Sequence, residues 1–161
     1  MQNADDGTAP ALAVAIVGLV VWRQLHTRPV RRNGSLIAPV VLGVLGISGL
    51  TLGIASADKH HPLTTAPVAL LTASFAVAAG FGVARARTVH VWRGPQGEVL
   101  RKGTAATTGL WIASVAMHIG LALWIDHSTT TGSLGTASLY AYLAIGVGTQ
   151  NLLVRGRAAA L

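Results

Sequence analysis

Long apolar segments without a charged side chain limit what this chain can fold into. Residues 36–57, 62–84, 104–125 and 128–154 contain no Asp, Glu, Lys or Arg. A helix needs roughly 20 mainly apolar residues to cross the hydrocarbon core of a bilayer, and each segment is at least that long. The sequence therefore predicts an all-α membrane protein.

The composition supports a membrane as the solvent. Hydrophobic residues make up 52% of the 161 and charged residues only 11%, whereas soluble domains average roughly 45–50% and 25%. The net charge of +7 does not indicate nucleic acid as a partner, because the basic residues stand at the ends of the apolar segments. The chain has no cysteine, which excludes disulfides and thiolate ligands.

A fifth, shorter apolar segment, 8–25, carries Arg23 near its end. An arginine there can extend its long side chain to the headgroups, so the segment can still cross the bilayer. The alternative is a cleaved signal peptide, in which positive charge precedes the apolar stretch. Here Asp5 and Asp6 precede it and arginines follow it. We favour an uncleaved helix with its N-terminus outside.

The connections between the apolar segments alternate in charge. Four arginines belong to the first connection when Arg23 at the end of the first segment is counted with it, one lysine to the second, five basic residues to the third and none to the fourth, and two arginines follow the last segment. Because Lys and Arg concentrate in cytoplasmic loops, we predict a multi-pass protein of the cytoplasmic membrane with its C-terminus in the cytoplasm. A single transmembrane domain, 1–161, should contain about five transmembrane helices, near 8–25, 36–57, 62–84, 104–125 and 133–154.

The connection 86–103 has a pattern of its own. β-prone residues flank Gly94-Pro95-Gln96-Gly97, where Pro at the second position and Gly at the fourth suit a type I turn. We expect a short cytoplasmic β-hairpin between the third and fourth helices. Because an isolated hairpin is only marginally stable in water, it should rest on the inner face of the bundle or on lipid headgroups.

Several residues of the cytoplasmic side are expected at the membrane surface. Tryptophan favours the headgroup region, and basic side chains favour anionic lipid. These interfacial or lipid-facing residues are Arg28, Arg31, Arg32, Arg85, Arg87, Trp92, Arg93, Arg101 and Lys102. The predicted partners are membrane lipids, with a membrane-protein partner or a homo-oligomer as further candidates.

Four glycines of the second predicted helix fall along one side of it. They are Gly43, Gly46, Gly49 and Gly53. Small residues at spacings of three and four let helices approach closely. Packing within the bundle is the favoured role, and a homo-oligomer interface is the alternative.

His118 is the main candidate for chemistry, as the only ionisable residue well inside a predicted span. It could bind haem or a metal, or relay a proton. A haem held by two histidines needs a second one at similar depth, and the other histidines flank the spans. A neutral, hydrogen-bonded structural histidine is the favoured interpretation, so no cofactor is assigned.

Acidic residues are missing from the predicted spans. Proton-coupled transporters and metal-dependent intramembrane enzymes place carboxylates there. The sequence also contains no nucleotide-binding loop, nucleophile elbow or metalloprotease motif. We name no catalytic residue, and the sequence favours a protein without enzymatic activity.

Three groups of residues carry a family resemblance. They are Arg28-Pro-Val-Arg-Arg32 with Ile37-Ala-Pro-Val40, Gly82-Val-Ala-Arg-Ala-Arg-Thr88 with Val91-Trp-Arg-Gly-Pro-Gln-Gly97, and Leu139-Tyr-Ala-Tyr-Leu143 through Arg157. They resemble the CcdC-like family of small bacterial membrane proteins of unknown activity, in the same order of helices and hairpin. The resemblance implies a gene neighbourhood associated with cytochrome c maturation. The family usually carries an arginine where this chain has His118.

Three functions follow as hypotheses. The leading one is a structural or accessory role, in which helix packing and a basic cytoplasmic face act on a partner or lipid. The second is a haem or redox-linked carrier that uses His118, connected with cytochrome maturation through the resemblance. The third is an oligomeric transporter or channel for a small solute, suggested by helices rich in glycine and alanine.

Overall fold

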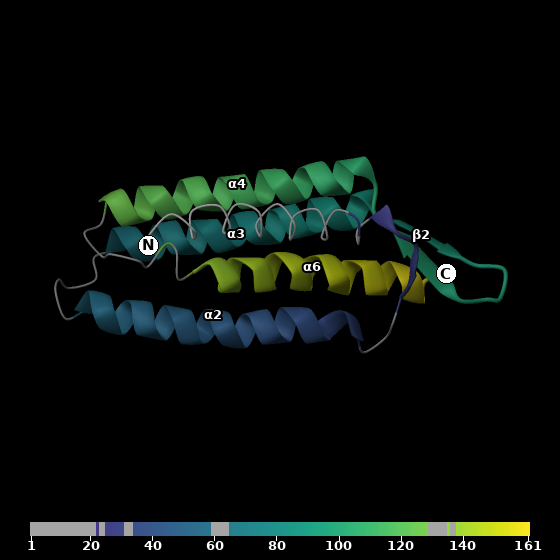
Figure 1. Cartoon of the computed structure of the whole chain (residues 1–161), viewed down its shortest axis with the longest axis horizontal. Coiled ribbons are helices and arrows are strands. Elements are labelled where there is room, and N and C mark those ends of the chain that lie inside the picture. Colours follow the sequence, from purple (N-terminus) through teal and green to yellow (C-terminus); the bar gives the residue numbers. More distant parts are fainter. Residues whose placement is uncertain (1–21, 23–24, 31–33, 59–64, 129–134, 136–137) are drawn as a thin grey trace, which may run out of the picture.

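The computed structural model describes residues 22, 25–30, 34–58, 65–128, 135 and 138–161. Within them, the longer helices are α2 (Gly34–Asp58), α3 (Thr65–Thr88), α4 (Ala105–Ser128) and α6 (Leu139–Ala159), and the strands are β1 (Arg28–Pro29), β2 (His90–Arg93) and β3 (Val99–Lys102) (Figure 1). The fold is mostly helical, with a small sheet at one end. The predicted first helix, 8–25, falls almost entirely outside the described residues.

Three helices are long and apolar enough to cross a membrane, at Leu36–Ala55, Thr65–Thr88 and Ala105–Ile125. Large apolar side chains of α2 are exposed, among them Ile37, Ile47 and Leu52 at 65%, 66% and 70%. A surface of this kind suits lipid better than water. The predicted total of five spans is not reached among the described residues, because α6 is not one of the three.

The helix α6 occupies the centre of the bundle. It packs on α2 along one side and on α3 along the other, and α4 packs on α3 (Figure 1). Its sequence is less apolar than that of its neighbours because Thr149, Gln150 and Asn151 interrupt it. Asn151 is nevertheless buried, since neighbouring elements of the chain cover this part of α6.

Small residues set the antiparallel contact between α2 and α6. A Cβ added at Gly46 would lie 2.5 Å from the backbone nitrogen of Ala141, and one added at Gly43 would lie 3.9 Å from the Cβ of Ala144. Two backbones can approach this closely only where a side chain is missing. Of the other two predicted packing residues, Gly53 is buried and Gly49 is half-buried.

A second pair of glycines brings α3 against α6. A Cβ added at Gly82 would lie 2.7 Å from the carbonyl oxygen of Gly146 and 2.8 Å from the Cβ of Thr149. At the end of this contact nearer the sheet, Ala86, Val89 and Val154 form a small apolar core on which Val91 packs. The sheet is thereby attached to the ends of α3 and α6.

The sheet contains the predicted hairpin and one further strand. β3 lies in the middle and pairs antiparallel with β2 and with β1. The backbone N–H of Gly97 donates to the Gly94 carbonyl at 3.0 Å, which closes the turn between β2 and β3. Gly97 adopts a φ of +82°, a conformation in which glycine avoids the strain of a Cβ.

Two details differ from the predictions at this end. The predicted third helix stops at residue 84 and the predicted hairpin begins at 86, but α3 continues to Thr88 and β2 begins at His90. In addition, β1 was not predicted. Its two residues pair through Arg28 with Arg101 and through Pro29 with Leu100, and proline is tolerated there because β1 is an edge strand.

Candidate functional site

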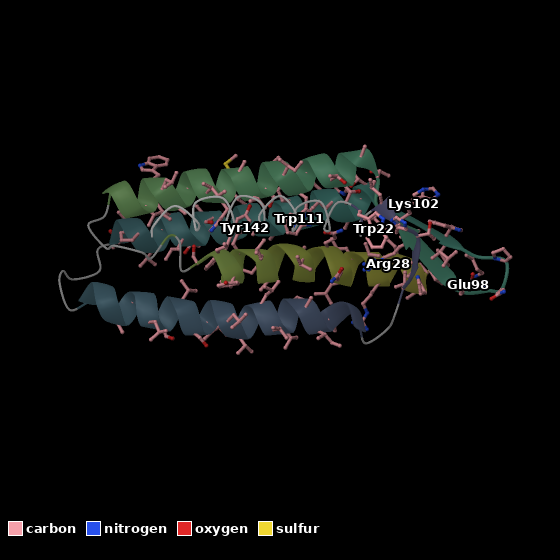
Figure 2. The ribbon with its side chains drawn as sticks, viewed as in Figure 1. Trp22, Arg28, Glu98, Lys102, Trp111 and Tyr142 are labelled. Atoms are coloured by element: carbon pink, nitrogen blue, oxygen red, sulfur yellow. The ribbon has the colours of Figure 1, made fainter. Side chains whose placement is uncertain are left out.

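Polar side chains gather in two places within the described structure. A buried polar column lies among α3, α4 and α6 and consists of Ser74, Arg85, Ser114, His118 and Tyr142, all of them buried. A basic end is formed by the sheet and the adjoining helix ends. Figure 2 labels Tyr142 and Trp111 in the first region and Arg28 and Lys102 in the second.

Arg85 belongs to the buried column, although its charge suggested a place at the membrane surface. Its side chain is 2% exposed, and its Nε donates to the Phe81 carbonyl at 3.3 Å. The guanidinium lies 5.3 Å from the centre of the Trp111 ring, a cation–π contact. Gly146 provides the space, since a Cβ there would lie 2.7 Å from Nη2 of Arg85. Arg85 is therefore a second buried ionisable residue beside His118, placed in the last turn of α3.

His118 lies near the middle of α4 and is 2% exposed. Its ring packs on that of Tyr142, with centroids 4.4 Å apart. Neither ring nitrogen has a hydrogen-bond partner among the described residues, and the same holds for the Oγ of Ser74. The hydrogen bond predicted for His118 is therefore not found in the described part of the chain.

Tyr142 connects α6 to α4 through its hydroxyl. This group donates to the Ser114 carbonyl at 2.9 Å and lies 3.0 Å from the Ser114 Oγ, from which it can accept. A buried phenol needs such partners, because an unsatisfied hydroxyl in the interior is destabilising. The contact fixes the ring on which His118 packs.

The column offers few groups for cofactor chemistry. A metal centre needs several ligands together, and no group of three or more His, Cys, Asp or Glu side chains lies close enough among the described residues. His118 has the nitrogen atoms that a haem iron binds. The ring is, however, enclosed and packed against Tyr142, so a haem could reach its nitrogens only if the surrounding side chains moved.

Threonines join α3 to α4 at the end of the column nearer the sheet. The hydroxyls of Thr88 and Thr107 are 2.9 Å apart, and the Thr104 hydroxyl donates to the Thr88 carbonyl at 3.1 Å. Sequence reasoning missed this cluster. The spacing of Thr104 and Thr107 at the start of a predicted helix could have indicated it, because threonine is favoured at helix N-termini.

The basic end collects the positive charge of the described chain. Every described Arg and Lys lies in the sheet or in the last turns of α3 and α6: Arg28, Arg85, Arg87, Arg93, Arg101, Lys102, Arg155 and Arg157. Glu98 is the one described acidic residue at this end, whereas Asp58 and Asp126 belong to the last turns of α2 and α4. Those helix ends lie away from the sheet in Figure 1. Charge is thus segregated along the bundle.

Some of these cations hold the sheet on the helices. Arg157 Nη1 donates to the carbonyls of Ala86 and Val89 at 2.7 and 3.0 Å, which caps the C-terminal end of α3. Arg101 Nη1 donates to Oδ1 of Asn151 at 3.3 Å. Burial and, secondarily, the positive charge of Arg28 lower the pKa of Arg101 below its ordinary value.

The remaining predicted surface residues lie on or beside the sheet. Trp92 is half-buried, pairs with Leu100 across the strands and contacts His90, with ring centroids 5.5 Å apart. Arg87, Arg93 and Lys102 are exposed. Arg31 and Arg32 lie outside the described residues.

Comparison with protein-family models, with curated proteins and with solved structures finds no match. The resemblance to the CcdC-like family therefore stays a prediction.

Proposed function

We propose that the protein is a structural or accessory component of the cytoplasmic membrane whose basic end binds anionic lipid headgroups. One observation carries the proposal: the described cations gather at the end of the bundle where the sheet lies, while Asp58 and Asp126 stand at the other. This polarity matches the enrichment of Lys and Arg on the cytoplasmic side. In the proposed orientation the sheet and the C-terminal end of α6 lie in the cytoplasm, and α6 crosses the membrane inside the bundle.

A cross-strand pair of like charges supports an anionic partner. Arg28 of β1 lies directly opposite Arg101 of β3 in the sheet register. Like charges in this position destabilise a sheet, and the positive charge of Arg28 adds to the effect of burial in lowering the pKa of Arg101. The carboxylate of Glu98 accepts a hydrogen bond from the backbone N–H of Gln96 at 3.1 Å, within the turn. A lipid phosphate near the two arginines would offset their repulsion.

The topology can be tested with single cysteines, since the native chain has none. Gln96→Cys in the hairpin and Thr65→Cys at the start of α3 both replace exposed residues. We expect a membrane-impermeant maleimide to label position 96 only in inverted vesicles and position 65 only in right-side-out vesicles. Labelling of position 96 from the outside would contradict the proposed orientation.

The lipid preference can be tested by thermal unfolding in detergent micelles. We expect added phosphatidylglycerol to raise the unfolding temperature more than phosphatidylcholine does, and high salt to remove the difference. Replacing Lys102 and Arg155 together by Gln should reduce the difference between the two lipids, because each basic residue near an anionic surface contributes about 1 kcal/mol to binding. Equal stabilisation of the native chain by both lipids would refute the proposed function.

A second candidate function is that of a haem-linked carrier. The observation in its favour is the pair of buried His118 nitrogens without a described partner. A Soret absorption band in the purified chain, lost in His118→Ala, would support this function. A colourless preparation that takes up no added haem would exclude it.

A further inference from the structure

An apolar groove lies between α3 and α4 and is open to the outside of the bundle. Val77, Gly80, Phe81 and Ala84 of α3 and Leu110 of α4 line it, and its volume is about 260 Å³. A Cβ added at Gly80 would meet no described atom within 4 Å, so a larger side chain there has open space to enter. The volume is below the roughly 300–1,000 Å³ of small-molecule pockets. A flexible hydrocarbon chain suits this shape and lining.

The groove ends toward the sheet at a polar boundary. The paired hydroxyls of Thr88 and Thr107 join the two helices there. Arg87 is exposed and lies three residues after Ala84, which in turn lies four residues after Gly80, so the three share one side of α3. A cation therefore stands one helical turn beyond the apolar lining, about 4.5 Å further along the axis.

This order of groups matches a phospholipid of the cytoplasmic leaflet. The groove belongs to two helices that are apolar enough to cross a membrane, so it lies at the depth of the acyl chains. Arg87 lies near the inner end of α3, at the depth of the headgroups. A free phosphate would use Arg87 and leave the groove empty, and an uncharged lipid would use the groove and leave Arg87 unpaired.

We propose that the groove holds one acyl chain of an anionic phospholipid whose phosphate binds Arg87. This site rests on the proposed function, because it assigns one of the lipids around the basic end to a defined place. The proposed site makes lipid binding depend on more than surface charge. Affinity depends on the acyl chain as well as on the headgroup.

Gly80→Leu tests the groove by filling it. Gly120→Leu is the matched control, because a Cβ at Gly120 of α4 also meets no atom within 4 Å. Each full-length chain is titrated in detergent with dioleoyl phosphatidylglycerol, and native mass spectrometry measures the bound lipid. We expect Gly80→Leu to weaken binding about tenfold, as when roughly two methylene groups lose their apolar contacts. Gly120→Leu should bind like the native chain.

Arg87→Gln tests the headgroup contact. It should weaken phosphatidylglycerol binding about fivefold and leave phosphatidylcholine binding unchanged. Arg155→Gln removes the same charge at the same end and should have the smaller effect. Glycerol phosphate, which has the headgroup chemistry without the acyl chain, should not compete. Competition by glycerol phosphate would show phosphate binding independent of the groove and would overturn the proposal.

The remaining outcomes separate this site from the proposed function. Equal binding of phosphatidylglycerol to the native chain and to Gly80→Leu would overturn the groove site, while the lipid preference of the basic end would stand. Equal affinity of the native chain for both lipids would overturn the proposed function itself. Lower stability of Gly80→Leu than of Gly120→Leu in lipid-free detergent would show that protein, from residues 8–25 or a second copy, fills the groove.

Discussion

The two sides of α6 hold their neighbours by different means. Toward α2, Gly43 and Gly46 let the helix backbones approach, and the contact depends on atoms that are missing. Toward α3 and α4, the side chains of Arg85, His118 and Tyr142 fill the space between the helices. An added atom should therefore destabilise the contact between α6 and α2. Removal of a polar contact should destabilise the packing of α6 against α3 and α4. Unfolding by SDS in mixed micelles can measure both.

Gly46→Ala should have the largest effect. The new Cβ would lie 2.5 Å from the nitrogen and 2.6 Å from the Cα of Ala141, and backbone atoms cannot rotate aside. We expect the free energy of unfolding to fall by about 3 kcal/mol, at the upper end for overpacking. Gly43→Ala is the control, because its Cβ would make an ordinary contact of 3.9 Å. Equal losses in the two variants would contradict the steric account.

Gly146→Ala adds the same atom on the other side of α6. Its Cβ would lie 2.7 Å from Nη2 of Arg85, the end of a flexible side chain. The guanidinium can move, so we expect a smaller loss of about 1.5 kcal/mol. A change in Trp111 fluorescence should accompany the loss, because the guanidinium lies over that ring. Gly148→Ala, whose Cβ would lie 3.6 Å from Pro39, should leave both readouts unchanged.

Tyr142→Phe removes the hydroxyl that bonds to Ser114. We expect the free energy of unfolding to fall by about 1 kcal/mol, the typical value for one hydrogen bond. Tyr140→Phe provides the comparison, since Tyr140 is exposed on the same helix and should change stability little. If Tyr140→Phe lowered the free energy of unfolding more than Tyr142→Phe did, the stabilising role assigned to the buried Tyr142 hydroxyl would be wrong.

His118→Phe should have the smallest effect. It keeps a ring on Tyr142 and removes two nitrogens that have no described partner. Replacing an unpaired buried polar group by an apolar one is nearly neutral, within about 0.5 kcal/mol here. A loss well above 1 kcal/mol in the same SDS titration would reveal a partner for His118, such as a buried water.

Much of the helical framework could be predicted because charge ends the apolar segments. α2 and α4 lie within a few residues of the predicted 36–57 and 104–125. The rule failed at Arg85, which was taken as the end of a span although α3 continues to Thr88. Nothing near Arg85 in the sequence shows that Gly146, on another helix, leaves room for its guanidinium.

The sheet was predictable only in its local part. Gly94-Pro95-Gln96-Gly97 carries the turn signal that joins β2 to β3, two neighbouring strands in the chain. β1 has only two residues, one of them Pro29, and its partner strand follows far along the chain. Neither strand propensity nor a turn signal marks such an edge strand.

The central position of α6 also sets an order for assembly. α2, α3 and α4 all precede it in the chain, and α2 packs mainly on α6. During synthesis α2 precedes its main described partner, while α3 and α4 can already join through their threonines. Transmembrane helices are each stable in lipid before they associate into a bundle. α6, the helix on which both α2 and α3 pack, is therefore the last of the described helices to be synthesised.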